Sequence, residues 1–486
     1  MTKRVLTLWA AILAVCLAGC SKSEPRLDAQ WRFSGADGLR TQKAAPALQQ
    51  IMSDPNVTEL APRLSTNVAK FALEWVGGAN PISDPTKSTE ALIRPLVDDL
   101  LAHESAGEIW RHTDGTPEIL LAVRISTDRA SVWSDAFPKW VKPYYSGPVG
   151  ATVSAEKGWL FASSRSGSEK ALTFRNRVLG SSAQPQRLLE FKSTPGVWPG
   201  LDLAATASNG AVRWSGTVSH PKAVGLVLKD WNYPTHLIRE PLVAFTATRG
   251  VTSFILEAIG TEAFTRGEAL GQMYLWSQGD NPFSTYGVVH SDKPAHLIAK
   301  AHAVIEPKYS TNILDGRLPG LVMYDQSKQI LGLSSAPIAT PTLSGPTNRE
   351  PGFVGLSLVS LRRSTNLPPA ELFAQMKKPG VVYYDWEITS ENIPHWSAGL
   401  QVKDISTGLR PSMTEGPGQR LLRKITDTDN TVTVLRQITP GVLEFQRKAP
   451  TGLTAFEWVV LTRWIDPPIA PERKLKSAVS LPNLKP

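Results

Sequence analysis

The chain has 486 residues, of which 42% are hydrophobic and 20% are charged, and its formal net charge at pH 7 is +9. Its two cysteines are Cys16 and Cys20, so the residues after position 20 contain no disulfide, thiolate metal site, iron–sulfur cluster or thiol nucleophile. The length predicts about two to four domains, and the apolar content, which includes 15 tryptophans, is sufficient for a substantial core.

The first twenty residues have the pattern of an export signal. Lys3 and Arg4 precede an apolar run over residues 5–17, which is too short for a lasting transmembrane helix. The run ends in a motif that resembles the lipobox of bacterial lipoproteins, formed by Leu17, Ala18, Gly19 and Cys20. A plain signal peptide, with Cys20 as a bystander, is the alternative interpretation.

The lipobox resemblance implies an anchor and a location. In such lipoproteins the cysteine thiol is alkylated with diacylglycerol and the freed amine is acylated with a fatty acid such as palmitate, which makes Cys20 the lipidated first residue. Several acyl chains hold a protein on a bilayer essentially permanently. An aspartate after the cysteine usually retains these proteins at the inner membrane, and Ser21 stands there instead. The resemblance therefore implies an outer-membrane protein that faces the periplasm.

The charge pattern narrows the expected partners. Removal of Lys3 and Arg4 with the signal lowers the net charge from +9 to +7, an excess that favours anionic head groups or acidic envelope polymers. The basic residues are otherwise scattered, apart from a short group at positions 473–476, so nucleic acid is not an expected partner. We expect the membrane, through Cys20, and envelope polymers or other envelope proteins.

Composition and periodicity divide the chain into five segments. Residues 1–19 are the signal peptide, 20–45 a polar lipidated tether, and 466–486 a polar tail rich in proline. Between them we expect a first α+β unit over 46–230 and a second over 231–465. Apolar spacing predicts helices over 47–52, 64–76 and 88–103, and an apolar helix or strand over 454–465.

A weak internal duplication follows residue 108. The first copy has strands at 109–110 and 118–125, a helix opening at 127–128, and a hairpin of 150–153 with 158–163. The second has strands at 273–276 and 284–290, a helix opening at 291–292, and a hairpin of 320–324 with 329–334. A partial third unit follows in strand 353–361, a helix after position 366, and strand 381–388.

The element order predicts an α+β fold with mainly antiparallel sheets backed by helices. This layout resembles that of uncharacterised bacterial envelope proteins in which a strand, a helix and a hairpin recur, and the resemblance carries no functional residue. Residues 336–351 contain four prolines and are expected to form a long loop.

The motifs of common enzymes are missing. The sequence has no Gly-x-Ser-x-Gly elbow, phosphate-binding glycine loop or His-Glu-x-x-His pair, and we expect no cofactor and no metal. Ser154 and Lys157 have a Ser-x-x-Lys spacing, but they fall in a predicted hairpin turn. Asp99 and His103 share a helix face that we interpret as exposed, whereas His296 and His302, six residues apart, do not share one.

One pair of acids invites a catalytic hypothesis. On a strand, Asp385 and Glu387 project from the same face about 7 Å apart, near the separation that glycosidases use, while Val382, Tyr384 and Trp386 face the other side. The simpler interpretation is an amphipathic strand with its acids in water. Most tryptophans lie in apolar contexts and are expected in the core, and Trp396 after His395 is the best candidate for an exposed ring.

These patterns lead to one preferred function and two alternatives. We expect a non-catalytic outer-membrane lipoprotein with an envelope-associated binding or scaffolding role. The first alternative is an envelope glycan hydrolase that uses Asp385 and Glu387 as its catalytic residues. The second is a carrier of an apolar ligand, which would need a large apolar cavity between sheet and helices.

Overall fold

The computed structural model describes residues 25–467, apart from 78–86, 146–149, 182–183, 195–199, 221–222, 259–266, 268–269, 280, 315–319, 336–340, 347–350, 360–365, 407–414 and 426–428. The signal peptide, Cys20 and the tail from 468 onward therefore lie outside the described residues, as does most of the expected loop over 336–351.

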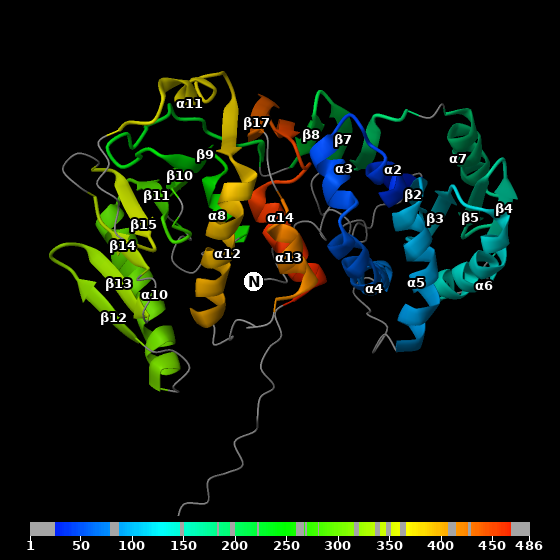
Figure 1. Ribbon diagram of the computed structural model, residues 1–486, viewed down its shortest axis with the longest axis horizontal. Coiled ribbons are helices and arrows are strands. Elements are labelled where there is room, and N and C mark those ends of the chain that lie inside the picture. The colour runs from blue at the N-terminus through cyan, green and yellow to red at the C-terminus, as the bar shows by residue number, and fades with distance from the viewer. Residues whose placement is uncertain are drawn as a thin grey trace, which may run out of the picture.

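The described residues form an α+β fold built on a large antiparallel sheet (Figure 1). Its strands are β1 (Arg26–Phe33), β2 (Ser105–Arg111), β3 (Pro117–Val123), β4 (Thr152–Glu156), β5 (Trp159–Ser163), β6 (Arg187–Ser193), β7 (Gly200–Ser208), β8 (Ala211–Ser219), β9 (Leu242–Arg249), β10 (Leu270–Gln278), β11 (Thr285–Ser291), β12 (Gly320–Asp325), β13 (Ile330–Ser335), β14 (Thr342–Ser344), β15 (Phe353–Ser357), β16 (Val381–Glu387), β17 (Thr431–Thr439) and β18 (Val442–Ala449).

The helices are α2 (Gly35–Arg40), α3 (Pro46–Met52), α4 (Pro55–Gly77), α5 (Lys87–Ala102), α6 (Ala130–Val141), α7 (Glu169–Gly180), α8 (Thr252–Ala258), α10 (Pro294–Leu314), α11 (Ala370–Ala374), α12 (Thr389–Ser406), α13 (Pro417–Leu422) and α14 (Ala455–Ile465). Helices α4, α13, α14 and α12 lie side by side in the middle of the molecule (Figure 1).

The hydrogen-bonded order of the strands runs through the whole sheet. From one edge to the other it is β4-β5-β3-β2-β1-β6-β7-β8-β18-β17-β16-β9-β10-β11-β15-β14-β13-β12, and every pairing is antiparallel. Strands β8 and β18 join the part of the sheet formed by β1 to β8 to the part formed by β9 to β18.

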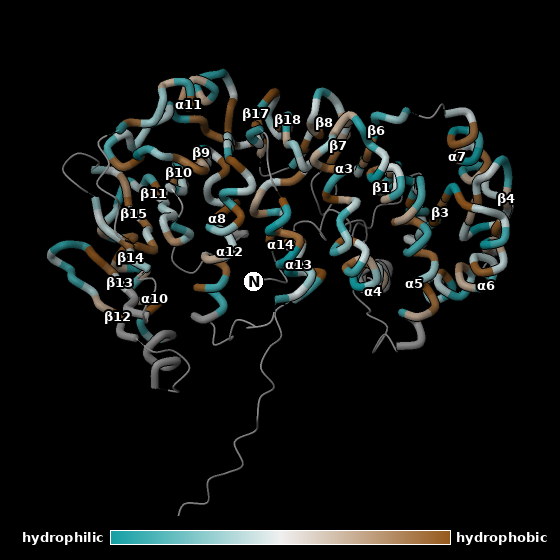
Figure 2. Tube along the Cα trace, viewed as in Figure 1, coloured by the Kyte–Doolittle hydropathy of each residue, from teal (hydrophilic) through white to brown (hydrophobic). Residues whose placement is uncertain are grey.

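A separate apolar cluster packs against each of the two parts of the sheet. Near one edge, Trp133 and Phe137 of α6 pack against strand β3, which is buried on both faces. Figure 2 shows the apolar character of β3 along the chain trace. In the other part, an aromatic cluster covers one face of the sheet and consists of Phe245, Tyr274, Trp276, Tyr286, Phe353 and Tyr384. Burial of side chains of this size stabilises each region by a few kcal/mol per residue.

A third cluster joins helices that are far apart in the sequence. Leu60 of α4 packs with Ile393 of α12, Leu421 of α13, and Trp458 and Val459 of α14. Helix α4 falls in the expected first unit and the other three in the expected second unit. The two units therefore share one layer of helices.

Most expected elements are present with shifted ends. Helix α4 begins before residue 64 and contains Pro62. The segment expected over 454–465 is helix α14, Ala455–Ile465, and a capping box between Thr454 and Glu457 stabilises its start. The expectation of a tether over 20–45 is wrong for residues 26–40, which form strand β1 and helix α2. In β1, alternating Ala29, Trp31 and Phe33 supply an apolar face, and the strand pairs with both β2 and β6.

Candidate functional site

Strand β16 separates apolar and acidic side chains onto opposite faces of the sheet. Tyr384 and Trp386 belong to or pack against the aromatic cluster, whereas Asp385 and Glu387 face α12 and α14. The prediction that the two acids share one face is confirmed by these contacts. The interpretation that they face water is wrong, because Asp385 is 5% exposed and Glu387 is 2% exposed.

Glu387 joins the first residues of two helices. Its Oε1 accepts hydrogen bonds from the Thr389 hydroxyl at 2.9 Å and the Ala455 backbone N–H at 2.6 Å, and its Oε2 accepts one from Asn392 Nδ2 at 2.7 Å. Thr389 begins α12 and Ala455 begins α14. At α14 Glu387 satisfies a backbone amide that has no partner within the helix, and at α12 it accepts hydrogen bonds from two side chains of the first turn.

Asp385 and Arg447 extend this polar contact toward β18. Asp385 Oδ1 accepts a hydrogen bond from Thr246 at 2.6 Å, and its Oδ2 has no hydrogen-bond partner among the described residues. Arg447 donates two hydrogen bonds to Glu457 of α14, at 2.7 and 3.0 Å, and a third to Thr433 at 2.9 Å. The fork of hydrogen bonds fixes α14 against β18.

These side chains form what we call the polar layer, a buried sheet-to-helix contact made of polar groups. Its members are Thr246, Asp385, Glu387, Thr389, Asn392, Thr431, Thr433, Arg447 and Glu457. Beyond it on α12, the buried His395 contacts Thr285 and the Gly279 carbonyl. Trp396, the ring that the sequence suggested to be exposed, is half-buried. It packs on Phe456 of α14.

Burial dominates the electrostatics of the polar layer. It raises the pKa of Asp385 to about 6, against the hydrogen bond from Thr246, which lowers it. Burial and the neighbouring Asp385 raise the pKa of Glu387 to about 8. Burial works against the charge of Arg447, but the ion pair with Glu457 outweighs it and raises the pKa of the guanidinium. With Asp385 and Glu387 protonated, the remaining charges of Arg447 and Glu457 cancel.

The other ends of α12 and α14 form a groove of about 400 Å³ together with α4 and α13, a volume in the range of small-ligand sites. Its apolar floor is formed by Leu422, Val459 and Ile465, and its polar rim by Arg63, Ser397, Gln401, Asp404, Glu415, Gln419, Arg463 and Asp466.

Two ion pairs brace the groove between helices. Arg63 of α4 pairs with Asp466, and Arg463 of α14 pairs with Asp404 of α12. Asp466 also accepts a hydrogen bond from the Gly418 backbone N–H at 3.2 Å. Asp385 and Glu387 do not line this groove, so the acid pair and the hollow are separate features.

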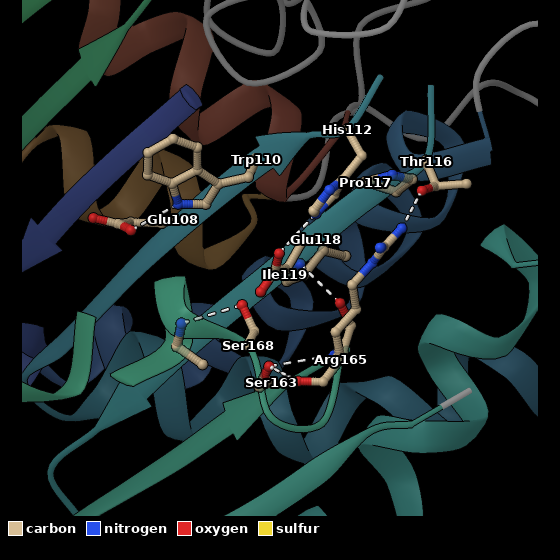
Figure 3. A network of polar contacts seen from close by, with 12 residues as sticks. Glu108, Trp110, His112, Thr116, Pro117, Glu118, Ile119, Ser163, Arg165 and Ser168 are labelled. Carbon is tan, nitrogen blue, oxygen red and sulfur yellow. Dashed lines mark hydrogen bonds and ion pairs between the residues drawn. The ribbon is translucent and has the colours of Figure 1, made fainter. Parts of the chain in front are cut away.

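A second group of buried acids lies on β2 and β3 (Figure 3). Glu118 accepts or shares a hydrogen bond with His112 Nε2 at 2.7 Å, and its other oxygen has no partner among the described residues. Glu108 accepts a hydrogen bond from Trp110 Nε1 at 2.9 Å and pairs with Arg177 of α7. Sequence reasoning missed these acids because their alternation with apolar residues in the strands is irregular.

The remaining candidates have structural partners. Ser154 lies on β4 and Lys157 in the turn after it, as expected for a hairpin. Asp99 is buried, contrary to the exposed face expected, because Trp133 Nε1 donates to it at 2.8 Å and Arg129 pairs with it. His103 contacts Asp37 instead. Within the described ranges, no three histidine, aspartate or glutamate side chains gather as a metal site would require.

Sequence reasoning also missed Asn392, Arg447 and Glu457. The one local signal for them was the Thr-x-x-Glu spacing of Thr454 and Glu457, which marks the start of a helix. Among the residues that the structure describes, no helix combines the length and apolar character needed to span a bilayer. The chain matches no protein-family model, and neither a curated protein nor a solved structure matches it.

Proposed function

We propose that the chain is a non-catalytic lipoprotein of the outer membrane, anchored by lipids on Cys20, whose α+β body serves in binding or scaffolding in the envelope. Support for the anchor comes from the lipobox resemblance of residues 17–20. Support for a non-catalytic body comes from one observation: the acids that a glycan hydrolase would use are hydrogen-bonded beneath α12 and α14.

The hydrolase alternative requires both acids to reach a sugar ring. A general acid must contact the leaving oxygen and the second carboxylate must contact the anomeric carbon or a water beside it. Asp385 and Glu387 instead contact Thr246, Thr389, Asn392 and Ala455. The apolar-carrier alternative meets a similar difficulty here, because polar side chains fill the space between β16 and the two helices.

The groove is the place that we propose for partner contact. Its apolar floor and charged rim resemble the composition of sites that bind segments of other proteins, with a buried centre and a polar edge. Most of its lining residues lie on helices, so its walls are positioned by the clusters that pack α4, α12, α13 and α14 together.

The body itself, we propose, arose by duplication. Counting outward from β8 and β18, the first part of the sheet has the order β8-β7-β6-β1-β2-β3 and the second part has β18-β17-β16-β9-β10-β11. Each strand has a counterpart at the same place in chain order, which favours two related units. In this arrangement the elements expected to form a partial third unit, β15, α11 and β16, belong to the second unit.

Fractionation of cells tests the anchor. When cells are grown with labelled palmitate, the wild-type protein is expected in the outer-membrane fraction with the label attached. Cys20→Ala is expected in the soluble fraction without label, whereas Cys16→Ala keeps the lipid because Cys16 lies in the segment that is removed. A Cys20→Ala protein that remains lipidated and membrane-bound contradicts the proposal.

Two further experiments test the body. Purified protein incubated with isolated cell-wall glycan is expected to release no reducing ends. Release that disappears in Asp385→Asn/Glu387→Gln would favour the hydrolase.

A photo-crosslinker at the exposed Gln401 is expected to give a defined adduct in cells, and Ser397→Trp, which fills the groove, is expected to remove it. The same crosslinker at the exposed Glu169 on α7 is the control. An adduct equally strong from both positions, or unaffected by Ser397→Trp, counts against the groove.

A further inference from the structure

Helices α12 and α14 connect the polar layer to the groove. Both begin at the carboxylate of Glu387, and both line the groove with residues nearer their other ends, among them Gln401 of α12 and Arg463 of α14. The two helices also pack along each other, with the Trp396 and Phe456 rings 4.6 Å apart. Glu387 therefore contacts the first turns of two helices whose later residues line the groove.

Among the described residues, the charged and titratable groups around Glu387 include one cation. From β16 come Tyr383 and Asp385, from α14 Glu457, and from β18 Arg447, which already pairs with Glu457. The neighbours from α12 are Thr389 and Asn392, that from β17 is Thr431, and those from β9 are Ala244 and Thr246, all of them neutral. Ionisation of both Asp385 and Glu387 thus adds two negative charges that no described cation balances.

Asn392 is able to contact Glu387 in either protonation state. Its Nδ2 donates to Glu387 Oε2, while its Oδ1 has no hydrogen-bond partner among the described residues. A half-turn of the amide about its Cβ–Cγ bond puts Oδ1 where it accepts the proton of a neutral Glu387. The Thr389 and Thr431 hydroxyls, 2.8 Å apart, are free to reverse their donor direction in the same way. The proton of a neutral Glu387 therefore finds an acceptor within the same contact.

We propose that the protons on Asp385 and Glu387 latch α12 and α14 onto the sheet, and that their loss in alkaline solution releases both helices together and loosens the groove. The latch itself depends only on the polar layer; its effect on partner contact rests on the function proposed for the groove.

The raised pKa values of Glu387 and Asp385 determine how the stability of this contact changes with pH. Burial raises the pKa of Glu387 from its ordinary 4.5 to about 8, so the folded state holds this proton more tightly than the unfolded state does. The stabilising contribution is complete below about pH 4.5 and is lost as the pH rises through about 8. Asp385, with a pKa of about 6, loses its contribution earlier in the same direction.

Hydrogen–deuterium exchange of the full chain tests the latch without any ligand. After correction for the intrinsic rate, opening of 389–406 and 455–465 in the wild type is expected to be at least about tenfold greater at about pH 9 than at about pH 6. In Glu387→Gln, which keeps a neutral polar group, both segments are expected to stay protected at both pH values. The control Glu444→Gln removes a carboxylate on β18 that pairs with Arg436 outside the polar layer, and it is expected to behave as the wild type.

Three results would overturn the latch. They are equal opening of the wild-type segments at both pH values, an unchanged pH response in Glu387→Gln, and release of only one of the two helices. If Glu387→Gln does not fold, Asp385→Asn takes its place and is expected to weaken the response of both helices. The exchange experiment contains no partner, so it tests the latch independently of the groove. If the latch responds to pH but the protein gives no groove-specific crosslink, the proposed function is contradicted and the latch is not.

Discussion

Replacing Arg447 with methionine removes the one cation of the polar layer. The side chain of Arg447 is 8% exposed and that of its partner Glu457 is 13% exposed, so the charges of this pair are largely shielded from water. Loss of one partner of a buried ion pair costs about 3–5 kcal/mol, since the other charge is left uncompensated. Here the carboxylate left behind is Glu457, with Asp385 nearby. We therefore expect Arg447→Met to lower the free energy of unfolding by about 3–5 kcal/mol.

The matching double variant separates the charge from the packing. In Arg447→Met/Glu457→Met no charge remains unpaired, so the destabilisation is expected to be smaller than that of Arg447→Met alone. Urea unfolding followed by tryptophan fluorescence measures the difference, because Trp458 of α14 is buried beside this contact. A cost of less than about 1 kcal/mol for Arg447→Met, or a double variant as unstable as the two single variants combined, would contradict the role assigned to this ion pair.

Three further changes test other parts of the structure. Gly107→Ala is expected to destabilise β2 by more than about 2 kcal/mol in a thermal melt, because a Cβ there would lie 2.2 Å from the Trp31 ring; Gly180→Ala, where no atom lies within 4 Å, serves as the control and is expected to have little effect. Ser21→Asp is expected to move the lipidated protein from the outer to the inner membrane on density-gradient fractionation; an unchanged distribution would contradict the sorting inferred from Ser21. Glu387→Gln is expected to flatten the fall in urea stability between about pH 5 and pH 8; parallel curves for the variant and the wild type would contradict the assigned ionisation.

Local patterns in the sequence predicted most elements of the fold. Alternation in β16 placed Asp385 and Glu387 on one face, and apolar spacing located helices α3 and α5. Strand β1 was missed because Glu24, Pro25 and the glycines after it suggested a polar linker. Pairing with β2 and β6, which are distant in the sequence, makes this segment a strand and buries Asp28 against Arg111.

Burial of the acid pair could not be predicted from the strand alone. Whether an acidic face of a strand meets water depends on what covers it, and α14 and β18 lie far along the chain from β16. Helix α12 follows β16 directly, but its apolar residues form no clear stripe that would have placed it on the sheet. The polar layer explains this weak pattern, because α12 contacts the sheet through Thr389, Asn392 and His395.

We propose that Asp385 and Glu387 form part of the interior and do not act on a substrate. Infrared difference spectroscopy of the protonated carboxyl stretch near neutral pH tests it most directly, by comparing the wild type with Glu387→Gln. The structure predicts a protonated carboxyl band in the wild type that is absent from the variant. A wild type without this band, with Glu387 already ionised and titrating near the ordinary 4.5 of a glutamate in water, would contradict the claim.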